Sequence, residues 1–104
     1  MTSTDRHAAA LEVEDGARAR VRGPLHFSTV TALLAVGREA IEAGRAEVID
    51  LSDVGASDSS GLALLIEWLA VAKQANRQLR YDNVPRQLQE LAHLSDVEEL
   101  LIPG

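Results

Sequence analysis

The sequence predicts an α/β fold built on a mixed, partly parallel β-sheet of about five strands. Apolar residues alternate with period two in some segments and recur at helical spacing in others, and these segments follow the order ββαβαβαβ. Strands that alternate with helices are typical of parallel pairing through right-handed crossovers. With 104 residues, of which 46% are hydrophobic, we expect a mobile tail over residues 1–9 and a single domain over residues 10–104.

The first two strands are predicted as a hairpin on either side of an Asp-Gly turn, because apolar and charged residues alternate on both sides. A two-residue loop would mix the apolar and charged faces. A loop over residues 15–17 instead pairs Glu14 with Arg18 and Leu11 with Val21, which leaves one face apolar and the other oppositely charged. We therefore expect the longer loop, with a solvated arginine face; an anion site is the alternative interpretation.

The remaining elements are read from caps and periodicity. Ser28 or Thr29 is expected to cap the first helix, which stops near Gly44. We then expect a short covered strand over residues 46–51, a loop over 52–60 and a long helix over about 60–75. Another short strand over 78–81, a third helix over 83–94 and a last strand over 97–104 should follow.

Composition excludes several classes of function. The net charge of −6 argues against broad nucleic-acid binding and gives no support for direct contact with an anionic membrane. The chain has no cysteine, which excludes disulfides and thiolate metal sites and fits a cytoplasmic protein. No signal peptide or membrane-spanning run is evident, so we expect any link to a membrane to go through a partner.

The loop that follows the expected strand 46–51 leads into the stretch SDSSG at residues 57–61. As a nucleophile elbow it would need partners such as Asp82 and His93, but 104 residues leave no room for a hydrolase architecture, and we expect no catalysis. Asp50, Asp53 and Asp58 could together hold Mg²⁺, although acids are also simply favoured in turns, and we expect neither metal nor cofactor.

Helix capping is the third interpretation of this loop. The side-chain oxygens of Asp58 and Ser59 can accept hydrogen bonds from the free N–H groups of the first helical turn. A hydroxyl at this position tolerates negative charge, so a phosphoryl group of about −2 could be added without disrupting the fold.

The long helix that follows carries two apolar stripes. Leu62, Leu65 and Leu69 belong to the first, which should face the sheet. A second stripe, about 110° around the helix, comprises Leu64, Trp68, Val71 and Ala75. It either packs against a neighbouring helix or is exposed and binds another protein. Tryptophan is enriched in interface hot spots, which favours binding. A stripe exposed without its partner could also produce homodimers in isolation.

Residues 48–101 resemble a STAS domain, the module of sulfate transporters and anti-sigma-factor antagonists. The resemblance covers residues from about 11 to 102. It rests on IDLSDV at 49–54, on D-S-S-G at 58–61 and on N-V-P at 83–85. The resemblance implies a sheet with its helices packed mainly on one face.

Two branches of the family compete. In anti-sigma-factor antagonists the first serine after the aspartate is phosphorylated, and Ser59 occupies that position. The stretch GPLHFSTVTALL at 23–34 is more similar to the MlaB branch, the STAS subunit of a phospholipid-trafficking ABC transporter that maintains outer-membrane lipid asymmetry; His26 replaces its usual threonine.

The MlaB resemblance implies a non-catalytic subunit that binds an MlaF-like ATPase subunit of the transporter and supports its assembly and activity. Such a protein would be cytoplasmic and peripheral to the inner membrane through that partner. We expect the partner-binding residues to be Asp58, Ser59, Ser60, Leu64, Trp68 and Val71. The alternative is an antagonist switched by phosphorylation of Ser59.

Overall fold

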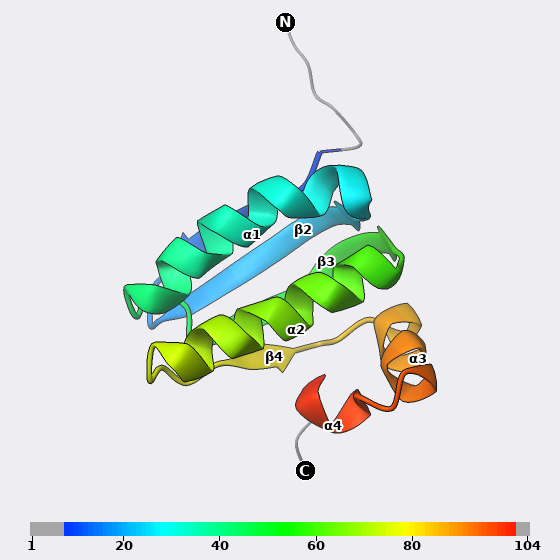
Figure 1. Ribbon diagram of the computed structural model, residues 1–104. Helices are drawn as coiled ribbons and strands as arrows, with labels where there is room; N and C mark the ends of the chain where they lie inside the picture. Colours follow the sequence, from blue (N-terminus) through cyan, green and yellow to red (C-terminus); the bar gives the residue numbers. More distant parts are fainter. Residues whose placement is uncertain (1–7, 102–104) are drawn as a thin grey trace, which may run out of the picture.

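The computed structural model describes residues 8–101. Figure 1 shows elements in the order ββαβαβαα, so the α/β class is confirmed, with four strands among the described residues where about five were expected. The predicted tail falls mostly outside the described residues. The elements are β1 (Ala10–Glu14), β2 (Arg18–Leu25), α1 (Phe27–Glu42), β3 (Val48–Ser57), α2 (Ser59–Gln74), β4 (Arg80–Asp82), α3 (Arg86–Leu94) and α4 (Glu98–Leu101).

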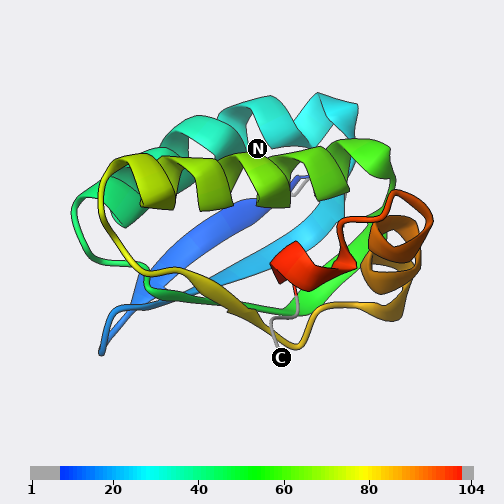
Figure 2. The ribbon, with the colours of Figure 1, turned by 60° about the horizontal axis from the view of Figure 1, so that its bottom comes forward.

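The strands stand in the order β1-β2-β3-β4. The first pair is antiparallel and the other two pairs are parallel. Figures 1 and 2 show α1 and α2 side by side on one face of the sheet, with α3 and α4 beyond β4. Because α1 follows β2 and α2 follows β3, both helices begin where these parallel strands end. The two helix N-termini therefore lie at the same end of the molecule.

The hairpin has the predicted register. Glu14 lies opposite Arg18 and Leu11 opposite Val21, with residues 15–17 as the loop. The ion pairs run diagonally across the strands, since Arg20 contacts Glu14 at 3.2 Å instead of its direct neighbour. Ala19 and Val21, on the apolar side of the hairpin, are buried in the core. The charged side therefore lies on the opposite face of the sheet, which α1 and α2 leave uncovered (Figure 2).

The predicted loop over residues 52–60 is mostly strand. β3 continues to Ser57 and pairs with β2 as far as Leu25, across two register shifts between the strands. These irregularities interrupt the alternation of apolar and polar residues, which is why the sequence alone indicates a loop. Only Asp58 separates β3 from α2.

The other differences concern helix ends and the last segment. His26, not Ser28 or Thr29, is the N-cap of α1, and the Thr29 hydroxyl accepts a hydrogen bond from the His26 N–H at 3.1 Å. The predicted last strand is wrong for residues 98–101, which form the helical turn α4; residues 102–104 lie outside the described part. Helix suits this segment because it buries Leu101 while its glutamates stay exposed.

Candidate docking site at the start of the second helix

The residue between β3 and α2 organises the start of the helix. Asp58 is the N-cap, and its Oδ1 accepts a hydrogen bond from the Ser60 N–H at 2.8 Å. Its own N–H donates to the Leu25 carbonyl at 3.1 Å, which holds the cap against β2. Capping by Asp58 is therefore confirmed. Ser59 is instead the first residue of the helix and is exposed to solvent.

Gly61 brings the first turn of α2 close to β2. A Cβ added at this position would lie 2.9 Å from the Cβ of Leu25 and 3.2 Å from its carbonyl oxygen. Real side chains do not tolerate such contacts, so glycine is needed for the close approach of helix and strand. Gly61 thus fixes how far Ser59 and Ser60 stand above the sheet.

The second stripe of α2 packs against α1. Leu64, Trp68 and Val71 are all buried, at 4%, 0% and 4% exposure. The Trp68 indole N–H donates to the Leu34 carbonyl of α1 at 3.3 Å, and its ring lies where a side chain at Gly37 would be. Of the two alternatives, packing against a neighbouring helix is confirmed and the exposed docking stripe is wrong.

The physical reason lies in the arrangement of the two long helices. They lie side by side on one sheet face, so α2 needs one apolar face for the sheet and another for α1. Trp68 and Val71 are therefore part of the core. The stripe that was expected to cause homodimers when exposed is buried instead. Binding of a partner at this end of the molecule stays a prediction, carried by other residues.

A shallow groove runs along the outside of this helix pair. We call it the α1–α2 groove; its volume is about 370 Å³, and it is lined by Val30, Thr31, Leu34, Ser60, Ala63, Leu64 and Glu67. A second hollow of about 320 Å³ shares Thr31 and Leu34 and continues the groove along α1. Leu64 is the one predicted stripe residue that reaches this surface, and Ser60 brings it next to the D-S-S-G stretch.

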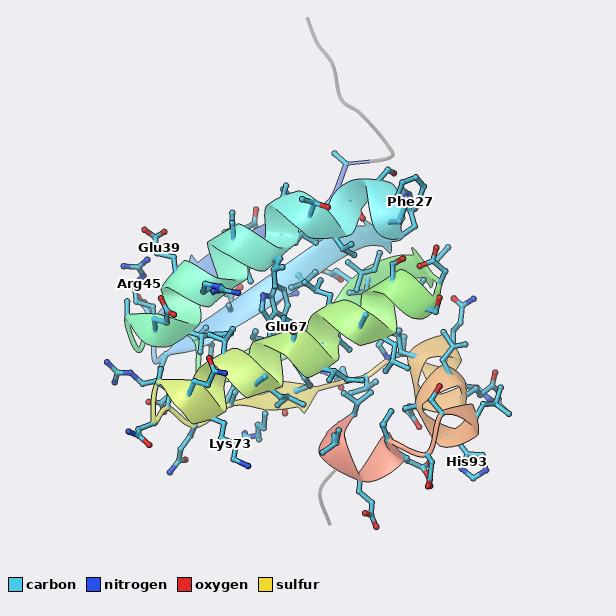
Figure 3. The ribbon with its side chains drawn as sticks, viewed as in Figure 1. Phe27, Glu39, Arg45, Glu67, Lys73 and His93 are labelled. Carbon is cyan, nitrogen blue, oxygen red and sulfur yellow. The ribbon has the colours of Figure 1, made fainter. Side chains whose placement is uncertain are left out.

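The first helix contributes an aromatic side chain that the sequence analysis did not single out. Phe27, the first residue of α1, is 77% exposed. Figure 3 shows it at the end of the molecule where α2 also begins. It shares a face of α1 with Thr31 and Leu34, at i, i+4 and i+7. That spacing was visible in the sequence, but only the position of α2 shows that this face borders a groove.

The groove carries charge at its far end. Glu67 of α2 lines it and lies 3.9 Å from Arg38 of α1, with both side chains about half exposed. Figure 3 shows Glu67 between the two helices. The near end carries the exposed carboxylate of Asp58. A partner would therefore meet an apolar strip with polar and acidic groups at its ends.

The three aspartates proposed as metal ligands do not gather. Asp50 and Asp53 both face Arg20, with Asp53 at 3.1 Å, whereas Asp58 caps α2. Residues 8–101 contain no group of three or more histidine, aspartate or glutamate side chains placed to hold a metal ion.

The residues of the alternative triad are occupied elsewhere. His93 Nδ1 lies 3.1 Å from a Glu98 carboxylate oxygen on the outer side of α3, and Asp82 forms ion pairs with Arg18 and Arg80. No hydrogen-bonded chain among the described residues links either of them to Ser59.

Comparison with known proteins establishes the family. The model of the family described as "Mlab, STAS domain" matches residues 9–103, which is nearly the whole chain. The chain therefore belongs to the STAS domain family, in the group described as Mlab.

Two solved structures share the fold. SpoIIAA, an anti-sigma factor antagonist, in its unphosphorylated form has a TM-score of 0.67 at 19% sequence identity, over 89% of this chain and 86% of that one. The Bacillus cell fate determinant SpoIIAA in its phosphorylated form has a TM-score of 0.64 at 19% identity, over 89% of both chains. At this identity the likeness concerns the fold. No curated protein sequence matches the chain.

None of the helices within residues 8–101 combines the length and the apolar character needed to cross a bilayer.

Proposed function

We propose that this chain is a non-catalytic accessory subunit of an ABC transporter for phospholipid trafficking, where it binds the ATPase subunit and supports its assembly and activity. The α1–α2 groove, flanked by exposed Phe27 and Ser59, is the proposed contact surface. It would hold the chain at the cytoplasmic side of the inner membrane through this partner. The description of the matching family, Mlab, supports this choice of transporter.

The observation that carries the proposal is the apolar strip beside the D-S-S-G stretch. Phe27 is the most exposed aromatic side chain in the described part of the chain, and it lies one turn of α1 before Thr31, which lines a groove with mostly apolar walls. Large aromatic side chains with adjacent apolar pockets are typical hot spots of protein interfaces. Asp58, Ser59 and Ser60 supply hydrogen-bonding groups at its edge, as an interface rim requires.

A substitution that fills the groove without touching the core tests the proposal. Ala63 lines the groove from α2 and is exposed, so Ala63→Arg places a long charged side chain in it while the fold stays intact. We expect the affinity for the transporter's ATPase subunit, measured by isothermal titration calorimetry, to fall by a factor of about 30 or more, as expected for loss of a hot-spot contact.

The matched control is Ala32→Arg, the same change at an exposed position on the side of α1 away from the groove. It should leave the affinity within about twofold, because it lies outside the contact. Equal binding by the wild type and Ala63→Arg would exclude the groove as the contact surface. No binding by the wild type would overturn the proposed function itself. Trp68→Asp is unsuitable here, since burying a charge would unfold the domain.

A second candidate function is an anti-sigma-factor antagonist switched by phosphorylation. What favours it is the exposed hydroxyl of Ser59 in the first turn of α2, where a helix N-terminus stabilises negative charge. Likeness in fold to both forms of SpoIIAA is consistent with this role. Mass spectrometry after incubation with an anti-sigma kinase tests it: phosphate on Ser59, absent in Ser59→Ala, is the expected result, and an unmodified chain would exclude this function.

A further inference from the structure

The end of β3 is held from its outer side by a side chain of α3. The Ser57 N–H donates a hydrogen bond to Gln87 Oε1 at 3.0 Å, across 30 positions of sequence. Gln87 is the second residue of α3, and Ser57 is the last residue of β3 and buried. This bond is therefore a direct link between α3 and the residue that precedes the cap of α2.

The Gln87 oxygen accepts the hydrogen bond that a carbonyl of a neighbouring strand would otherwise accept. On its outer side β3 pairs with β4, but the register ends at Asp50 opposite Asp82. Ser57, the last residue of β3, is reached by no strand on that side in the described part of the chain; its neighbour Asp58 bonds to β2 instead. A buried N–H without a partner is costly, so the Gln87 oxygen satisfies a group that the sheet leaves open.

A second tether joins the same two parts of the chain. Asn83, in the turn between β4 and α3, donates from Nδ2 to Asp50 Oδ1 at 3.0 Å. The start of α3 is thus attached to β3 at two points, one in the strand and one at its end. Leu88, buried one residue after Gln87, anchors the helix to the core.

We propose that Gln87 is a positioning residue for the docking site: it fixes the end of β3, and through it the height and direction at which α2 presents Ser59 and Ser60. This inference deepens the proposed function and rests on it for its effect on partner binding. It also couples α3 to the docking site, so a change in the seating of α3 alters binding at a surface that α3 does not touch.

Two substitutions separate the hydrogen bond from the shape of the side chain. Gln87→Met keeps an unbranched chain of similar length and removes the oxygen acceptor, whereas Gln87→Glu retains an acceptor oxygen in the same place. Gln89→Met is the matched control on the same helix, since Gln89 bonds to the Val84 carbonyl and not to Ser57. Amide hydrogen exchange by NMR of the isolated full chain, together with calorimetric titration of the ATPase subunit, provides the two readouts.

For Gln87→Met we expect the Ser57 amide to exchange about tenfold faster, as loss of one hydrogen bond implies, with exchange at the centre of α2 unchanged. Affinity for the ATPase subunit should fall about fivefold, and Gln87→Glu should restore both values. Gln89→Met should change neither.

The proposal is overturned if Gln87→Met leaves Ser57 exchange unchanged, if Gln89→Met accelerates it equally, or if faster exchange leaves the affinity unaltered. A wild-type chain that does not bind the ATPase subunit would instead overturn the proposed function. In that case Ser57 exchange in the isolated chain still decides whether Gln87 positions the start of α2.

Discussion

At the scale of single residues, the carboxylate of Asp50 shows how one side chain of β3 contacts both β2 and the turn that follows β4. It is buried in β3, and its Oδ1 accepts from the Asn83 side chain and from the Ser52 N–H at 2.9 Å. Its Oδ2 lies 3.9 Å from Arg20 of β2. The hydrogen bond from Asn83, followed by that from Ser52, holds the pKa of Asp50 below its usual value.

This lowered pKa gives stability a defined pH dependence. The unfolded chain protonates Asp50 near pH 3.9, so the stabilisation is complete above about that pH and is lost as the pH falls through the lower pKa of the folded state. Asp50→Asn keeps an acceptor oxygen but removes the charge. We expect its deficit in free energy of unfolding, measured with urea, to be constant from about pH 7 to 5 and to shrink below about pH 4.

A deficit that stays the same down to about pH 2 would contradict this account, because a carboxyl with an ordinary pKa contributes no such change. The comparison of the two proteins at each pH cancels the titration of the other carboxylates, which both proteins share.

At the scale of elements, the packing of α1 against α2 depends on Gly37. Glycine inside a helix costs up to about 1 kcal/mol relative to alanine, so a surface position would gain from Gly37→Ala. Here the added methyl group would overlap the indole ring of Trp68. Overpacking of this kind costs about 1–3 kcal/mol, and we expect a net loss of stability. Urea unfolding, followed by the fluorescence of the single tryptophan, measures it.

Ala32→Gly, at an exposed position of the same helix, provides the scale of helix propensity alone and should cost about 1 kcal/mol. A Gly37→Ala protein more stable than the wild type would show that α1 and α2 are not packed as closely as described.

The elements also show what a sequence can predict. The spacing of Leu64, Trp68 and Val71 correctly predicts a second apolar face on α2. This spacing does not show what covers the face. An apolar stripe that packs against a helix of the same domain has the same spacing as one that binds another protein. The last segment was ambiguous for a related reason: it holds two adjacent leucines, and a short apolar run does not distinguish strand from helix.

At the scale of the whole molecule, local rules determined the hairpin and family motifs indicated the architecture. The register over residues 11–21 followed from keeping charges off the apolar face, a constraint that involves only two adjacent strands. The α1–α2 groove could not be predicted in this way. It combines Thr31, Leu34 and Ala63, which belong to different helices, and it exists only because β2 and β3 deliver both helices to the same side.

We propose above that the helix side of the molecule, at the end where α1 and α2 begin, docks the ATPase subunit. Hydrogen–deuterium exchange of the full chain, with and without a saturating amount of that subunit, tests it most directly. We expect protection on binding at residues 27–34 and 58–67, with the uncovered face of the sheet unchanged. Protection confined to β1 and β2, or to α3, with no change at residues 27–34 and 58–67, would contradict it.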